Sequence, residues 1–178
     1  MGLKQVQKMM NEMTGDVDTL FGLIDQQASR YSKEMDDYVH YINNRINNDE
    51  KFTDKEVEEI ILKVPVYLYF AVEGLEQLGI EMDLAKNRKV EKENKVYLDT
   101  DGTIEARKRE AELMTAEETV LESVSTRSYK LLNARIQKAE AIYNGFKKVY
   151  DKRIKEIDAQ MLDRKYKDLS GAGHIDNK

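Results

Sequence analysis

Hydrophobic side chains recur every three or four residues through most of this chain, which is the repeat of a helix that packs along its length against other helices. The clearest run lies in the last third of the sequence. It consists of Tyr129, Leu132, Ile136, Ala139, Tyr143, Phe146 and Tyr150, separated by steps of 3 and 4 residues. A similar stripe follows residues 3–46. The pattern therefore predicts two long amphipathic helices, one in each half of the sequence.

The region between them begins with the strongest helix-start signal in the chain. Thr53 and Glu56 have the spacing of a capping box, in which each side chain accepts a hydrogen bond from the other residue's backbone N–H. This predicts a helix over residues 54–95. Pro65 should bend that helix or start a new one, because proline lacks a backbone donor and crowds the preceding turn. Residues 64–71 are apolar nearly all round, so we expect them to be the most buried part of the protein.

A turn is predicted where this helix ends. The apolar residues 96–98 suggest a short strand or an extended arm, and residues 99–102 read Asp-Thr-Asp-Gly, in which Gly102 is free to take a positive φ angle. Thr103 follows and is suited to cap a short helix over residues 104–114.

The last helix has a second capping signal. Thr115 and Glu118 repeat the capping-box spacing and predict a helix over residues 116–168. The remaining residues, 170–178, lack any hydrophobic pattern, and we expect a disordered tail.

These elements predict an all-α fold, a long-helix antiparallel bundle or coiled coil. Residues 1–48 are expected to form an N-terminal heptad helix that serves as an oligomerisation arm, and residues 49–169 the helical core. A helix of 40 residues spans roughly 60 Å, more than the width of a compact domain of this size. Because such a helix needs partners along its length, we expect a homo-oligomer.

Composition narrows the possible chemistry. The 178 residues include no cysteine, two histidines and a single proline, and 35% of them are charged. Disulfides, thiol catalysis and cysteine zinc sites are thereby excluded, and two histidines leave little for a metal site or a catalytic triad. The sequence contains neither a phosphate-binding glycine loop nor a long apolar run. We therefore expect a cytoplasmic protein that is not an enzyme, has no cofactor, metal or small-molecule substrate, and does not contact a membrane.

The charge is distributed unevenly. Residues 1–82 hold 8 basic and 16 acidic side chains, whereas residues 127–155 hold nine basic and two acidic ones, a local net charge of +7 in a chain of net charge −5. A basic helix face interleaved with tyrosines is typical of single-strand nucleic-acid binding. The heptad spacing of Tyr129, Tyr143 and Tyr150 instead favours packing against other helices. The candidate phosphate-binding residues in this region are Arg127, Lys130, Lys138, Lys147, Lys148 and Lys152.

About 80 residues, from Leu78 to about Glu156, carry a degenerate pattern of basic and aromatic positions. The pattern comprises the basic residues 85–89, Tyr97 followed by Gly102, the charged stretch 107–113, the Thr-Ala-Glu-Glu of 115–118, residues 129–142, and Arg153-Ile154. In these features the chain resembles the phage recombination mediators of the UvsY type. Residues 3–46 are not part of the resemblance.

The resemblance implies a ring-like homo-oligomer that binds single-stranded DNA and works with a recombinase and a single-strand-binding protein. By position it adds candidate phosphate contacts at Lys86, Arg88, Lys89, Lys92, Arg107, Lys108 and Arg109.

Taken together, the residues and the resemblance predict a non-enzymatic single-stranded DNA-binding oligomer that acts as a phage recombination mediator and recombinase loader. Two alternatives stay open. One is a structural coiled-coil adaptor or assembly protein, which the heptad stripes would serve equally well. The other is a helical inhibitor of a host enzyme, in which the acidic residues 1–82 mimic nucleic acid.

Overall fold

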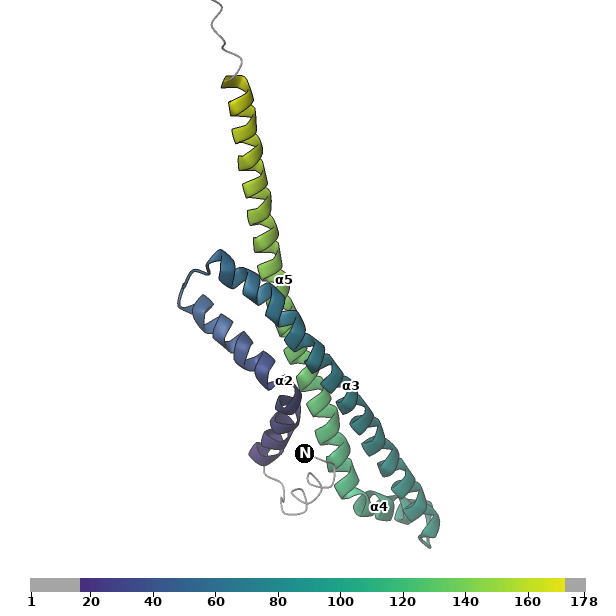
Figure 1. Ribbon diagram of the computed structural model, residues 1–178. Coiled ribbons are helices and arrows are strands. Elements are labelled where there is room, and N and C mark those ends of the chain that lie inside the picture. Colours follow the sequence, from purple (N-terminus) through teal and green to yellow (C-terminus); the bar gives the residue numbers. More distant parts are fainter. Residues whose placement is uncertain (1–16, 172–178) are drawn as a thin grey trace, which may run out of the picture.

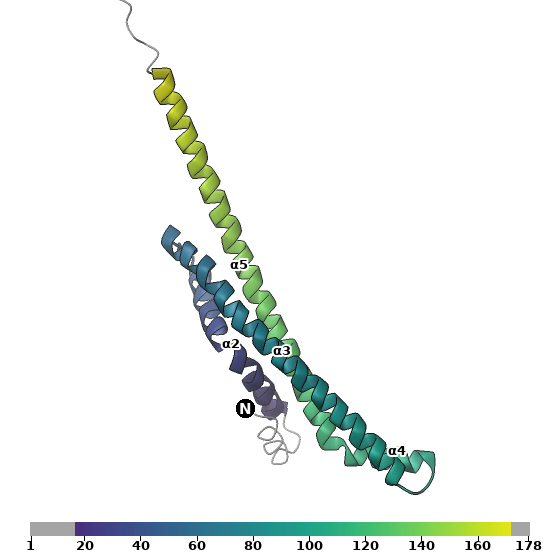
Figure 2. The same cartoon turned by 45° about the vertical axis from the view of Figure 1, so that its right-hand side comes forward.

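The protein is an antiparallel bundle of long helices, as the sequence predicts. The computed structural model describes residues 17–171, with side chains to residue 167. Its elements are α2 (Val17–Asn47), α3 (Asp54–Asp99), α4 (Ile104–Met114) and α5 (Ala116–Gly171), and no strand occurs within the described range. α3 and α5 run antiparallel along one another, α2 packs against both, and α4 lies at the turn between them (Figures 1 and 2). The predicted heptad positions before residue 17 and most of the predicted tail lie outside the described residues.

The described part of the predicted N-terminal arm belongs to the bundle. Leu23, Ala28, Met35 and Ile42 of α2 are all buried. They recur at roughly helical spacing on one side of α2, which therefore packs against α3 and α5 as a third member of the core.

Arg45 stabilises the connection from α2 to α3 by several hydrogen bonds. Its guanidinium donates to Glu50 Oε2 at 2.9 Å, to Glu56 Oε1 at 2.5 Å and to the Lys51 carbonyl at 3.0 Å. It also lies over the ring of Phe52, 4.4 Å from the centroid. One cation thus joins the last turn of α2 to the first turn of α3.

The start of α3 is the predicted one, and its end lies further along the chain. The capping box of Thr53 and Glu56 is confirmed, with both hydrogen bonds present. The helix continues through Pro65 and to Asp99, so the predicted strand or extended arm over residues 96–98 is wrong. Thr100 closes the helix, because both its backbone N–H and its hydroxyl donate to the Val96 carbonyl.

The junction between α4 and α5 also differs from the prediction. Thr103 caps α4 as expected, and Gly102 has a φ of 121°. The predicted capping box at Thr115 and Glu118 is wrong: the Thr115 hydroxyl donates back to the Ala111 carbonyl at 2.7 Å. The Glu118 carboxylate accepts from Lys92 of α3 instead. A tertiary ion pair therefore replaces a local cap.

The core is narrow and rich in small side chains. Its main cluster consists of Ala28, Met35, Ala71, Leu78, Leu132, Ile136 and Ala139. Such residues let helix backbones approach closely, and the closest approach is at Gly74 of α3, where an added Cβ would lie 2.3 Å from Tyr31 Cβ.

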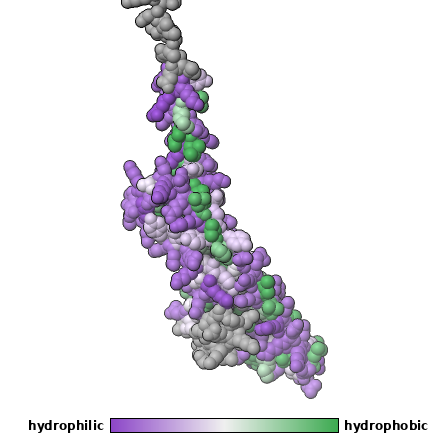
Figure 3. Space-filling view, in the orientation of Figure 1, coloured by the Kyte–Doolittle hydropathy of each residue, from purple (hydrophilic) through white to green (hydrophobic). Residues whose placement is uncertain are grey.

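Much of the apolar surface is left uncovered. The prediction that residues 64–71 form the most buried part is wrong in half of that segment: Val64 and Ala71 are buried, but Val66, Tyr69 and Phe70 are exposed. Figure 3 shows hydrophobic side chains at the surface along the bundle and on the projecting part of α5. Nevertheless, no helix within residues 17–171 is long and apolar enough to cross a membrane.

Candidate nucleic-acid interface

The two sides of α5 have opposite character. The side that faces α2 and α3 holds the buried residues Leu121, Val124, Ser125, Ser128, Leu132, Ile136 and Ala139. The opposite side carries a line of exposed cations, which we call the basic stripe. It consists of Arg127, Lys130, Lys138, Lys148, Lys152 and Lys155. Their separations of 3, 8, 10, 4 and 3 residues are sums of 3 and 4, so they share one face of the helix.

The basic stripe is long and has few acidic neighbours. From Arg127 to Lys155 it covers roughly 42 Å at 1.5 Å per residue. Of the two acidic residues in this range, Glu140 lies to one side of the stripe, whereas Asp151 follows Lys148 by three residues and precedes Lys155 by four, and so borders their face. Lys152 lies 3.8 Å from Glu156, an exposed contact that contributes little. Within the described residues the other five stripe cations form no ion pair, so they are available to an anionic ligand.

Two of the predicted phosphate contacts have partners inside the bundle. Lys89 Nζ donates to Glu122 Oε2 at 2.9 Å, and Lys92 Nζ donates to Glu118 at 2.8 Å. The hydrogen bond with Glu122 raises the pKa of Lys89. Both lysines therefore link α3 to α5, and phosphate binding would have to break these pairs.

The other predicted basic clusters lie on α3 and α4 and not on α5. Lys86, Arg88, Lys108 and Arg109 are exposed on α3 and α4, near the end of the bundle opposite to the projecting end of α5 (Figure 1). Arg107 of α4 is half-buried, and among the described residues its Nε has no hydrogen-bond partner. Because Lys89 and Lys92 pair with Glu122 and Glu118, residues 86–92 lie beside the start of α5, just before the stripe begins.

Lys147, also predicted as a contact, is exposed but directly precedes Lys148 in the helix. Its side chain therefore points about 100° away from the stripe.

Two of the four tyrosines of α5 pack against the core. Tyr129 and Tyr143 pack against the buried clusters, and Tyr129 lies close to Gly79 of α3. The interpretation of Tyr129 and Tyr143 as packing residues is confirmed, whereas Tyr150 is half-buried and belongs to none of the described core clusters. Tyr166, which the sequence analysis did not consider, is 67% exposed. Positions 155, 159, 162 and 166 are separated by steps of 4, 3 and 4 residues, so Tyr166 lies on the same side of α5 as Lys155. This spacing is the signal in the sequence by which Tyr166 could have been found.

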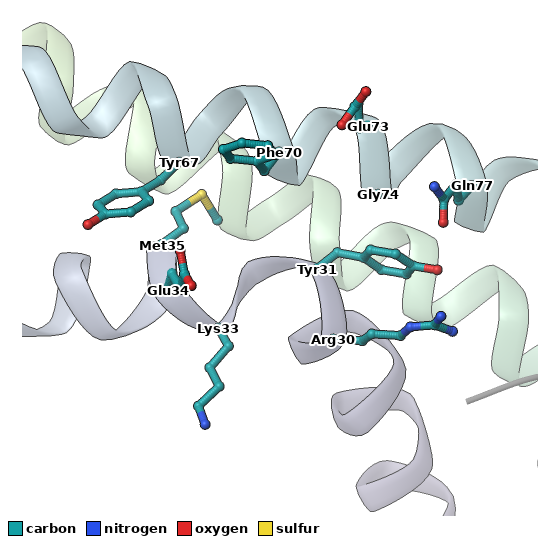
Figure 4. Close-up of a pocket in the computed structure, with 10 residues that line it drawn as sticks. All are labelled: Arg30, Tyr31, Lys33, Glu34, Met35, Tyr67, Phe70, Glu73, Gly74 and Gln77. Atoms are coloured by element: carbon teal, nitrogen blue, oxygen red, sulfur yellow. The ribbon is translucent and has the colours of Figure 1, made fainter.

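A shallow groove runs between α2 and α3. Figure 4 shows Tyr67 and Phe70 of α3 near Met35, and Tyr31 beside Gly74. Its walls are mostly aromatic and charged side chains on helix surfaces. Across the part of the chain that the structure describes, no group of three histidine, cysteine, aspartate or glutamate residues is placed to hold a metal ion. The basic stripe is therefore the feature with the clearest binding chemistry.

Comparison with known proteins adds no family to this description. No protein-family model matches the chain, and no curated protein or solved structure is significantly similar to it. The functional interpretation therefore depends on the residues and geometry of this chain alone.

Proposed function

We propose that the protein binds single-stranded DNA along the basic stripe of α5 and catalyses no reaction. The observation that carries the proposal is the line of six exposed cations on one face of a single helix. Cations spaced along a groove or stripe bind phosphates and release counterions, which supplies most of the affinity in sequence-independent binding. Such an interface holds the nucleic acid without reading its sequence.

Tyr166 supports single strands as the preferred form. Its exposed ring lies on the same side of α5 as Lys152 and Lys155. An unpaired base can stack on such a ring, whereas the bases of a duplex are already stacked on one another, and stacking contributes about 1–3 kcal/mol per base. Replacing Tyr166 with alanine should therefore weaken binding to a single strand and leave binding to heparin, a polyanion without bases, unchanged.

The salt dependence of binding tests the proposal. For six phosphate contacts on a single strand, the slope of log K against log salt is about −4. A labelled oligothymidylate followed by fluorescence anisotropy should thus lose roughly 300-fold in affinity between about 50 and 200 mM salt. The triple variant Lys130→Gln, Lys138→Gln, Lys148→Gln should have a slope of about −2 and lose only about 20-fold over the same range.

A matched control distinguishes the effect of the stripe lysines on binding from the effect of the net charge of the whole protein. Lys33, Lys51 and Lys55 are exposed on α2, the connection and α3. Replacing all three with glutamine changes the net charge by the same amount and should leave the slope near −4. Absence of binding at about 50 mM salt, or an equal loss in the control, would contradict the proposal.

A structural adaptor is the second candidate, and the exposed apolar residues of α3 and α5 favour it. An adaptor that does not bind nucleic acid would give no anisotropy change at low salt. The recombinase-loading role that the sequence resemblance implies remains a prediction. It requires in addition that the protein accelerate the assembly of a recombinase on DNA.

A further inference from the structure

The end of α5 projects from the bundle as an arm. Arg153 Nη1 donates to Asp54 Oδ1, in the first turn of α3, at 2.5 Å. We call residues 154–171, beyond this ion pair, the arm (Figure 2). Every described side chain of the arm, from residue 154 to residue 167, is exposed. An isolated helix of this length is marginally stable in water, so a partner would stabilise it.

The arm carries an apolar stripe that continues the one packed in the core. Ile154, Ile157 and Met161 are 41%, 48% and 50% exposed, and they follow Tyr150 by steps of 4, 3 and 4 residues. The basic stripe and Tyr166 lie on the opposite side of the same helix. One side of the arm is therefore apolar, and the other carries charges of both signs, including Lys155, Glu156 and Asp163, together with the exposed Leu162 and Tyr166.

A second uncovered stripe lies on α3, which we call the outer stripe. It runs through Leu62, Val66, Tyr69, Glu73, Glu76 and Ile80. Its first three members are 72%, 53% and 62% exposed, and the side of α3 directly opposite holds the buried Val64, Ala71 and Leu78. α3 thus has two hydrophobic sides, of which its own bundle covers only one.

The arm and the outer stripe have matching spacing. Steps of 4, 3, 4 and 3 residues separate Tyr150, Ile154, Ile157, Met161 and Arg164, and the same steps separate Leu62, Val66, Tyr69, Glu73 and Glu76. Aligned in parallel, the two stripes pair Ile154 with Val66 and Ile157 with Tyr69. Two helices with the same heptad spacing can pack side by side over their whole common length.

One pair of opposite charges lies at the end of this contact. Residues 64–85 of α3 contain Glu73, Glu76, Glu81 and Asp83 and no basic residue. The apolar stripe of the arm is flanked by Asp158 along its length and by Arg164 and Lys165 at its end. In the parallel alignment Met161 faces Glu73 and Arg164 faces Glu76, so opposite charges meet just beyond the apolar contact.

The arm cannot reach the outer stripe of its own chain, because α3 begins where the arm begins and runs in the opposite direction. In a second copy, related by a two-fold axis near the base of the arm, α3 runs in the same direction as the arm and lies beside it. Each arm then runs parallel to the α3 of the other copy, since α3 and α5 are antiparallel within each chain. A two-fold axis buries both arms in one reciprocal interface.

We propose that the protein forms a two-fold dimer in which the arm of each copy packs on the outer stripe of α3 in the other, with Arg164 facing Glu76. The dimer covers both apolar stripes and leaves the basic stripe on its outside. It goes beyond the proposed DNA binding and is independent of it, because none of the residues tested below belongs to the basic stripe.

Sedimentation velocity at micromolar concentration tests the dimer. The wild-type chain should sediment as a dimer. The arm variant Ile154→Ser, Ile157→Ser and the α3 variant Val66→Ser, Tyr69→Ser should each be monomeric, with helical circular dichroism retained, because the four side chains are exposed in the single chain. The control Leu98→Ser, Ile104→Ser removes two apolar residues at the far end that are more exposed, 75% and 65%, and should remain dimeric.

A charge exchange tests the alignment. Arg164→Glu and Glu76→Arg should each raise the dimer dissociation constant about tenfold, since two-fold symmetry places the pair twice in the interface, and the two changes together should restore it. A monomeric wild-type chain would overturn the proposal, and a different protein would then be the candidate that covers the two apolar stripes. A dimer that the α3 variant leaves intact would also overturn it, in favour of contact between the two arms. The same holds if Arg164→Glu and Glu76→Arg together did not restore the dissociation constant of the dimer.

Discussion

The contact between Gly74 and Tyr31 determines how closely α2 and α3 approach, and replacing Gly74 with alanine tests it. An added Cβ would lie 2.3 Å from both Cβ and Cγ of Tyr31. Carbon atoms ordinarily approach to about 3.5 Å, so the side chain or the helices would have to move by about 1.2 Å. Because Tyr31 Cβ is fixed to the backbone of α2, a rotation of the ring does not relieve the contact, and the helices must separate.

The magnitude follows from two opposing effects. Alanine in place of glycine stabilises a helix interior by about 1 kcal/mol. Overpacking a closely packed contact destabilises by about 1–3 kcal/mol. Gly22 and Gly145 are matched controls, because both lie inside helices and an added Cβ at either meets no atom within 4 Å. We expect Gly145→Ala to stabilise the fold by about 1 kcal/mol, and Gly74→Ala to be less stable than Gly145→Ala by about 1–3 kcal/mol.

Urea unfolding followed by circular dichroism measures these differences. All variants should be compared at one protein concentration, because association adds concentration-dependent stability. If Gly74→Ala stabilised the protein as much as Gly145→Ala does, α2 and α3 would not be in the close contact described, and the packing argument would fail.

Three further predictions concern buried and charged groups. Ser128→Ala removes the hydroxyl that donates to Gln27 Oε1 at 2.8 Å and should destabilise by about 1–3 kcal/mol in urea unfolding. Ser125→Ala removes a buried hydroxyl that has no partner among the described residues and should be neutral or stabilising. Arg135→Met removes the guanidinium that pairs with Asp25 and Asp36 of α2 and should destabilise by about 1–3 kcal/mol. Because the Arg135 side chain is only 19% exposed, about 1 M salt should not abolish this effect. The pKa of Glu56 is lowered from 4.5 to about 2, mainly by the backbone N–H of Thr53 and then by Arg45, so its contribution is present above pH 4.5 and is lost as the pH falls towards 2. The melting temperatures of the wild type and Glu56→Gln should therefore differ at pH 7 and converge near pH 2, and a constant difference would argue against this cause.

The helices could be predicted from the sequence because their signals are local. The capping box at Thr53 depends on a residue three positions away, and the 3–4 spacing of α5 identifies Leu132, Ile136 and Ala139 as buried. The second capping box failed for a tertiary reason. Glu118 pairs with Lys92, which is 26 residues distant, and no local pattern shows that competition.

The candidate site was predictable only in part. Spacing alone placed the cations of α5 on one line, but it could not show that Lys89 has a partner in Glu122, 33 residues away. An apolar pattern also does not reveal which chain covers it. Residues 64–71 look buried in the sequence, yet Val66 and Tyr69 are exposed in the single chain, which is the observation that led to the proposed dimer.

The most direct test of the central claim is a lysine footprint of the wild-type protein. Acetylation of lysines, quantified by mass spectrometry with and without a single-stranded oligonucleotide, reports which side chains the DNA covers. We predict protection of Lys130, Lys138, Lys148, Lys152 and Lys155, and unchanged reactivity at Lys33, Lys51 and Lys55. If saturating oligonucleotide left the reactivity of the five stripe lysines unchanged, or protected only Lys86 and Lys108, binding along the basic stripe would be contradicted.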